Sequence, residues 1–249
     1  MLKNPRLQLG ASLWVAGMAG VAALTITLIP QLLAKASQQV PASVAIAASL
    51  LQSGVLLALA VWAGVAFSRP LGLGAPVVVA ALAGSGMLEA LKRQLLPAAI
   101  VGLVVAGFLV YLTSAAPMEL QALGTQFHIP LVPKLLYGGV TEEILMRWGL
   151  MSALIWLPWR FLQRRNGPPR TAYVAGGVVV AALLFGLGHL PAVVAMGAEL
   201  NPAVVAHILV GNTLPGILFG VLYWRWGLEA AILAHALAHA ASTLALSLV

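Results

Sequence analysis

The chain has 249 residues, of which 61% are hydrophobic and only 8% are charged, and its mean hydropathy is +1.01. Soluble domains carry about 25% charged residues, so this composition excludes an ordinary soluble fold. The formal net charge of +7 does not indicate nucleic-acid binding, because the basic residues gather in short loops beside apolar runs. The chain has no cysteine, which excludes disulfide bonds and cysteine-ligated metals.

The chain contains several long segments without a charged residue, and each has at least the ~20 residues that a spanning helix needs. They cover residues 7–34, 36–68, 94–118, 171–198, 200–224 and 230–249. A membrane β-barrel would show alternating polar and apolar residues, and the sequence has no such alternation. The sequence therefore predicts an all-α polytopic membrane protein.

Three spanning helices are expected in the first half, at about residues 9–33, 41–67 and 95–115. The apolar segment 77–91 between the second and third is short and ends in charged residues. We interpret it as a half-helix or interfacial segment rather than a full span. Residues 117–133 contain prolines and polar side chains and are expected to form an interfacial loop.

Four more spanning helices are expected in the second half, at about residues 134–156, 171–190, 202–223 and 228–249. A loop at 160–170 carries four arginines, and such clusters beside spanning helices mark the cytoplasmic side. We therefore expect seven spans with a cytoplasmic N-terminus, or eight if segment 77–91 also spans, in the inner membrane of a prokaryote. One domain, 1–249, is expected, with N-terminal helices at 1–130 and a core of helices at 131–249.

The helix expected at 134–156 is unusual because Glu142, Glu143 and Arg147 interrupt it. Insertion scales assign such a residue a cost of roughly 2.5–3.5 kcal/mol near the bilayer centre, so it marks a functional site by default. Glu143 and Arg147 have i,i+4 spacing in the favourable order and are expected to pair. Glu142 points about 100° away around the helix and has no such partner. Its partners are therefore expected elsewhere in the chain.

Later helices bring further polar side chains into the apolar region. They are His189, His207, Asn212, His235 and His239. A lone histidine such as His207 is expected to hydrogen-bond the backbone, and Asn212 to repair backbone bonds that Pro215 disrupts. One unpaired acid with imidazoles on two other helices indicates chemistry instead, so Glu142, His189 and His235 form the candidate site. Positions along the helices place Glu142 and His235 near mid-membrane and His189 nearer the outer end.

Four motifs follow one another over about residues 131–241. They are Glu142-Glu143-x-x-x-Arg147, Phe185-x-x-x-His189, a glycine-containing apolar helix at 216–223, and His235. This ordered set resembles the CPBP family, the CAAX-protease and bacteriocin-processing group of intramembrane proteases, which includes the Ras-converting CAAX endopeptidase. The resemblance implies a helical membrane fold with a conical cavity, and hydrolysis of a peptide bond inside the membrane.

The resemblance also implies a role for individual residues. Glu142 is expected to act as general base on a water that His189 helps to hold. His235 and the residue four positions later are expected to stabilise the oxyanion, while Phe185, Glu143 and Arg147 support the site. The family usually has asparagine or a similar small polar residue at that later position, where this chain has His239. The expected reaction needs no cofactor, and the expected substrate is a peptide or a lipidated protein.

Three alternatives remain open from the sequence. His235-x-x-x-His239 has the spacing of two zinc ligands, although position 236 is alanine rather than a general-base glutamate. A zinc site of Glu142, His189, His235 and His239 is therefore an alternative to metal-free chemistry. The second alternative is a non-enzymatic protein that binds a membrane peptide, as an immunity protein or scaffold does. The third is a proton-coupled carrier, which the absence of an inverted repeat disfavours.

Overall fold

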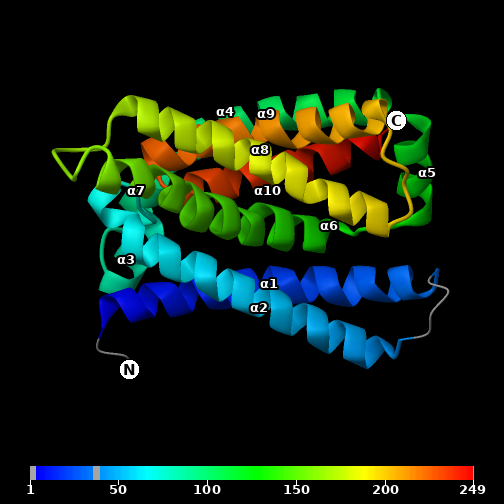
Figure 1. The fold of residues 1–249 in the computed structure, drawn as a ribbon, viewed down its shortest axis with the longest axis horizontal. Coiled ribbons are helices and arrows are strands. Elements are labelled where there is room, and N and C mark those ends of the chain that lie inside the picture. Colours follow the sequence, from blue (N-terminus) through cyan, green and yellow to red (C-terminus); the bar gives the residue numbers. More distant parts are fainter. Residues whose placement is uncertain (1–3, 36–39, 249) are drawn as a thin grey trace.

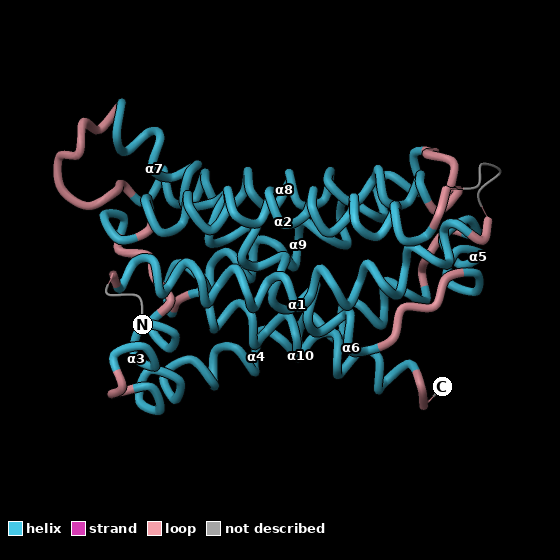
Figure 2. The backbone as a smooth tube through the Cα atoms, turned by 90° about the horizontal axis from the view of Figure 1, so that it is seen from below, coloured by secondary structure: helices cyan, strands magenta, loops and turns pink. Residues whose placement is uncertain are grey.

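The computed structural model describes residues 4–35 and 40–248, and these residues contain helices, turns and loops but no strand. Figure 1 shows long helices lying side by side, and Figure 2 shows the connecting loops gathered at the two ends of the bundle. The beginning of the first helix and the end of the last lie at opposite ends of this bundle (Figure 1). Lys3, near the N-terminus that is expected in the cytoplasm, lies outside the described residues.

Among the described residues, six helices are long and apolar enough to cross a membrane. They are α1 (Pro5–Leu33), α2 (Ala42–Phe67), α4 (Met87–Ser114), α8 (Thr171–Ala195), α9 (Pro202–Trp226) and α10 (Leu228–Leu246). The predicted all-α polytopic membrane fold is therefore confirmed. The number of spans, seven or eight, stays a prediction.

A further helical run, residues 131–161, lies among these helices, and we call it the site helix. It consists of α6 (Leu131–Pro133), η2 (Lys134–Glu142), η3 (Ile144–Met151) and α7 (Ser152–Phe161), with Glu143 joining η2 to η3. The parts η2 and η3 are π-helical, with wider turns than an α-helix. Such turns are rare and are often found at functional sites.

The short apolar segment at 77–91 does not form one continuous helix. Its first half is α3 (Pro76–Ala83), which lies at one end of the bundle (Figure 1). Gly84 and Gly86 have positive φ angles of 72° and 74° and turn the chain into α4. The half-helix interpretation is confirmed for α3, but the boundary of the following helix is wrong, because α4 already begins at Met87.

Two other connections contain short helices. The segment 117–133, expected to be a loop, contains α5 (Met118–Gln126), so that expectation is wrong for its first half. The turn between α2 and α3 contains the short 3-10 helix η1 (Arg69–Leu71). Figure 1 places α5 at the end of the bundle opposite α3, where it covers the end of the neighbouring helices.

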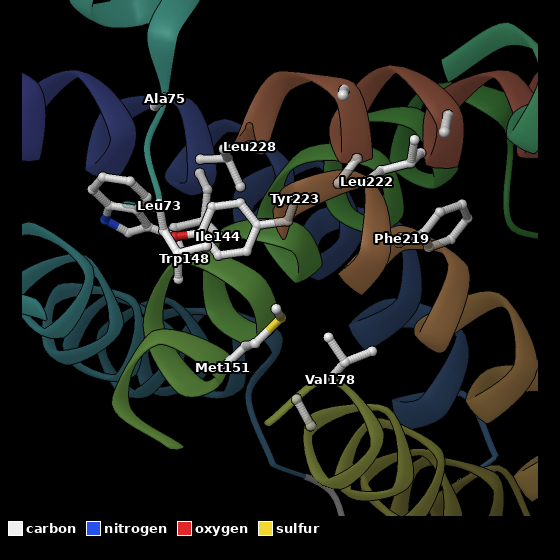
Figure 3. Packing of buried hydrophobic residues seen from close by; sticks show 14 of the residues in the cluster. Leu73, Ala75, Ile144, Trp148, Met151, Val178, Phe219, Leu222, Tyr223 and Leu228 are labelled. Carbon is white, nitrogen blue, oxygen red and sulfur yellow. The ribbon is translucent and has the colours of Figure 1, made fainter. Parts of the chain in front are cut away.

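The site helix packs against most of the other long helices. Its side chains Ile144, Trp148 and Met151 are at most 1% exposed. Figure 3 shows them beside Tyr223 of α9 and Val178 of α8, within the buried hydrophobic cluster. The indole of Trp148 meets the ring of Tyr223 edge-on, with 6.5 Å between the ring centroids. The helix that carries the charged motif is thus enclosed by protein rather than exposed along its length.

Hydrogen bonds and close backbone contacts fix the site helix against α1 and α2. Thr141 donates from Oγ1 to the carbonyl of Gly17 in α1 at 2.7 Å, and Trp148 donates from Nε1 to a backbone carbonyl of α2 at 3.3 Å. Gly149 lies so close to α2 that a Cβ atom there would stand 2.6 Å from the Cβ of Ala60. These contacts set the depth and the rotation of the helix, and therefore the direction in which its acids point.

Candidate active site

Glu143, the second acid of the motif, is fully buried and has two partners. Its Oε2 lies 3.2 Å from Nε of Arg147, which is the pair that the i,i+4 spacing predicts. Its Oε1 lies 2.8 Å from Nδ1 of His235, a contact that the sequence does not predict. Arg147 also donates from Nη2 to the carbonyl of Gly216 at 2.9 Å. Glu143 and Arg147 therefore tie the site helix to α10 and α9.

Glu142, the first acid, faces a cavity of about 560 Å³ with a side chain that is 15% exposed. Its Oε1 lies 3.8 Å from Nε2 of His189, and its Oε2 lies 4.0 Å from Nε2 of His235. Both distances are too long for direct hydrogen bonds. They suit contacts that one water molecule bridges. The structure thus brings together the acid and two imidazoles that the sequence singles out on three helices.

The hydrogen bonds of the two imidazoles determine which ring nitrogen carries the hydrogen. Nδ1 of His189 lies 2.8 Å from the carbonyl of Phe185, which can only accept. Nδ1 of His235 faces the carboxylate of Glu143, which is also an acceptor because Arg147 pairs with it. Each Nδ1 is therefore the donor, and in the neutral rings each Nε2 presents a lone pair toward Glu142.

Aromatic rings hold both imidazoles in place. Phe185 meets His189 edge-on with 4.6 Å between centroids, and Phe219 stacks on His235 at 4.6 Å with an interplanar angle of 22°. The guanidinium carbon of Arg147 lies 5.1 Å from the ring centre of Phe185. Phe185 therefore supports the site through its ring and its carbonyl. Phe219 was not singled out from the sequence, where its only signal is its place in the glycine-containing apolar helix.

His239 lies beside the site without a direct contact to its acid. Its ring stacks on that of His235, with 4.9 Å between centroids and an interplanar angle of 27°. It lines the same cavity as Glu142. In the part of the chain that the structure describes, the histidines within 4.0 Å of Glu142 are His189 and His235. A role for His239 as oxyanion donor stays a prediction.

His207 and Asn212, the polar side chains of α9 that the sequence singles out, form no hydrogen bond or ion pair with Glu142 among the described residues. Asn212 donates from Nδ2 to the carbonyl of Ile208 at 2.8 Å. Pro215 has no backbone N–H, so the carbonyl that lacks its helical donor is that of Gly211, four residues earlier. The expected repair is therefore not the bond that forms. The backbone hydrogen bond expected for His207 is wrong, because this side chain has no hydrogen bond within the described residues and lines a second cavity next to the first.

The possible metal ligands among the described residues do not form a metal-binding group. Among the described residues, no group of three or more His, Asp and Glu side chains lies close enough together to hold a metal ion. The zinc alternative is therefore supported only by the residue types involved, since carboxylate and imidazole are common zinc ligands.

A comparison with protein families identifies the part of the chain that holds this site. Residues 125–241 match the family model described as type II CAAX prenyl endopeptidase Rce1-like. This segment is similar to that family. The Rce1-like segment includes the whole site helix and continues into α10, so it contains Glu142, His189 and His235.

The match confirms the family resemblance that the motifs indicate, over nearly the same residues. At the level of the family, it supports a CAAX-type endopeptidase in the membrane. No curated protein and no solved structure matches the chain.

Proposed function

We propose that the protein is an intramembrane endopeptidase in which Glu142 activates the attacking water. The observation that carries this proposal is the position of the Glu142 carboxyl, 3.8 Å from Nε2 of His189 and 4.0 Å from Nε2 of His235, in a largely apolar cavity. A water between these groups has a base on one side and an imidazole on the other. The family description supports a prenylated or membrane-associated peptide as substrate.

The first step is attack of water on the carbonyl carbon of the scissile bond. One O–H bond of the water breaks and its proton goes to Glu142, a carbon–oxygen bond forms, and the carbonyl π pair becomes the oxyanion. His189 holds the water through the lone pair of Nε2. In the second step the oxyanion collapses, the C–N bond breaks, and Glu142 passes its proton to the leaving nitrogen. The products are a carboxylic acid and an amine, and no other reactant is consumed.

The oxyanion needs donors, and the Glu143 contact determines how His235 supplies one. Because Nδ1–H is directed at Glu143, His235 donates from Nε2 only as an imidazolium. In that form two acids face one arginine and one imidazolium, so the four charges cancel. When Glu142 takes the proton, the oxyanion replaces its negative charge. One such preorganised donor contributes roughly 3–4 kcal/mol in acyl-transfer enzymes. We propose His239 as a second donor.

Cleavage of a defined peptide tests this proposal. The probe is a fluorescence-quenched peptide with a farnesylated cysteine near its C-terminus, assayed in liposomes. Glu142→Gln keeps the size of the side chain but removes its basicity, so we expect kcat to fall about 10²- to 10⁴-fold, the usual contribution of a general base. Thermal unfolding should stay unchanged. Glu89→Gln, at an exposed acid in α4, is the matched control.

Equal turnover by the wild type and Glu142→Gln would end the proposal. The same assay, repeated after dialysis against a chelator, tests metal-free chemistry. We expect full activity and no stoichiometric metal by elemental analysis. Loss of activity that returns with zinc would replace the metal-free reaction by the zinc-dependent alternative.

A further inference from the structure

Two cavities meet at the beginning of η2. The site cavity of about 560 Å³ adjoins a second cavity of about 500 Å³, which is lined in part by α5. Several residues line both cavities, and all of them are apolar except Lys134 and Asn212. We call this shared region the junction. It lies between the part of the space that α5 lines and the part that holds Glu142, and most of the residues that line this space are apolar.

Lys134 is a cation without a partner. Among the described residues that line the two cavities, it is the only lysine or arginine, and it is half-buried. It makes no hydrogen bond or ion pair within the described part of the chain. Asn212, across the junction on α9, uses one of its two amide hydrogens for the carbonyl of Ile208. An ammonium and a free amide N–H in apolar surroundings suit an anion, and a carboxylate in particular.

We propose that the junction binds the free C-terminal carboxylate of the substrate and that Lys134 is the specificity-determining residue. This inference rests on the proposed function, because the substrate must occupy the site cavity to reach Glu142. The C-terminal carboxylate of that bound substrate is then the anion that lies beside Lys134. The phosphate of a lipid is the other source of such an anion, and the experiment below separates the two.

The spacing along the site helix fits a short peptide segment. Lys134 and Glu142 are eight residues apart, which is at most about 12 Å along the axis at 1.5 Å per residue. An extended peptide covers about 3.3–3.6 Å per residue. A carboxylate held at Lys134 therefore places a peptide bond about three residues upstream beside Glu142.

Two peptides that differ only at their C-terminus test this inference. One farnesylated peptide ends in a free carboxylate and the other in a carboxamide. The wild type should cleave the carboxylate form with about tenfold or higher kcat/KM, mainly through a lower KM, as expected for hydrogen bonds to a charged group. Lys134→Gln should bring the two peptides within about twofold by weakening the carboxylate form alone. Lys134→Arg should keep most of the preference, and Lys92→Gln, outside both cavities, should keep all of it.

A binding measurement separates recognition from turnover. In the Glu142→Gln background, fluorescence anisotropy should show tighter binding of the carboxylate peptide, and the additional Lys134→Gln change should abolish that difference. The assays are repeated in zwitterionic liposomes with and without phosphatidylglycerol. An effect of Lys134→Gln that follows the anionic lipid and ignores the peptide terminus would assign Lys134 to a lipid phosphate and overturn the inference.

The remaining outcomes distinguish this inference from the proposed function. If the wild type cleaves both peptides alike, or if Lys134→Gln keeps the preference, the carboxylate site is refuted while the protease stands. If neither peptide is cleaved, or if Glu142→Gln cleaves both like the wild type, the proposed function fails and the inference fails with it.

Discussion

Two adjacent acids on the site helix have different surroundings. Glu143 is fully buried, with Arg147 and His235 as partners, so its charge is compensated within the protein. Glu142 is turned into the cavity, where imidazole nitrogens of His189 and His235 lie 3.8 and 4.0 Å from its oxygens, beyond hydrogen-bond distance. The first acid of the motif is thus available to a ligand, whereas the second holds an imidazole in position. Such orienting carboxylates behind a histidine commonly affect activity 10- to 100-fold in metal sites.

The acid and the two imidazoles of the candidate site were predictable from the sequence, but Phe219 and the contacts among these residues were not. The i,i+4 spacing predicts the Glu143–Arg147 pair because both residues belong to one helix. The Glu143–His235 bond depends on how α10 docks against the site helix, and spacing within one helix carries no such information. The stacking of Phe219 on His235 has the same origin.

The buried pair allows a prediction about stability. Arg147→Met leaves the Glu143 carboxylate buried without its cation, and breaking a buried ion pair in this way costs about 3–5 kcal/mol. The double variant Glu143→Gln with Arg147→Met removes both charges and should recover part of that loss. Unfolding in a mild detergent measures both, with Arg93→Met at an exposed arginine as control. A single variant as stable as the wild type, or a double variant no better than the single one, would contradict this account of the pair.

At the level of helices, the π-helical turns decide which side chains share the cavity. In an α-helix, residues five apart differ by about 140° in direction, so Tyr137 and Glu142 would face different sides. In η2 both line the site cavity, together with Lys134 and Gly138. An α-helical interpretation of the sequence therefore does not predict Tyr137 as a cavity residue, whereas Lys134, Gly138 and Glu142 follow at four-residue spacing and would share a face in an α-helix as well.

The end of α8 explains the unexpected depth of His189. The sequence predicts an end near residue 190, because Pro191 lacks the backbone N–H of a helical residue. The helix instead continues through Pro191 to Ala195, as neighbouring helices in a membrane allow. The helix is therefore longer at this end than predicted, and more of it lies beyond His189. His189 is accordingly deeper than expected, at the level of Glu142.

The approach of the site helix to α2 allows a prediction at this scale. Gly149→Ala puts a Cβ atom 2.6 Å from Cβ and 2.7 Å from Cα of Ala60, and the backbone there has no room to yield cheaply. We expect a loss of about 1–3 kcal/mol, the usual cost of overpacking, and lower activity as the helix shifts. Gly176→Ala, where a Cβ atom meets open space in α8, should be neutral or slightly stabilising. Equal unfolding temperatures for the two variants would refute the close approach.

At the scale of the whole molecule, the distribution of polarity is that of a protein in lipid. Large apolar side chains such as Leu51 and Leu96 are 72% and 70% exposed on α2 and α4. In contrast, Glu143 and Arg147 are at most 1% exposed in the interior. A soluble monomer rarely exposes large apolar surfaces of this kind. The composition predicts this arrangement, because a chain so poor in charges has too few polar side chains to cover itself.

The orientation of the bundle in the membrane is the last prediction. The loop at 162–170 and α5 lie at opposite ends (Figure 1), and the arginines of that loop favour the cytoplasm. The chain has no cysteine, so Asn166→Cys in the loop and Ala122→Cys in α5 each introduce a single thiol at an exposed position. A membrane-impermeant maleimide should label Ala122→Cys in intact spheroplasts, and Asn166→Cys only after permeabilisation.

Labelling of both thiols from the same side would mean that the bundle does not cross the membrane between these two ends. The reverse pattern would keep the crossing but place the arginine loop outside. Residues of α5 line the second cavity, and the junction at Lys134 is part of that cavity. The membrane side on which Ala122→Cys is labelled is therefore the side toward which the junction lies. With α5 outside, a peptide terminus bound at Lys134 would lie toward the outer surface, and the segment upstream of the cleaved bond would extend toward the cytoplasm.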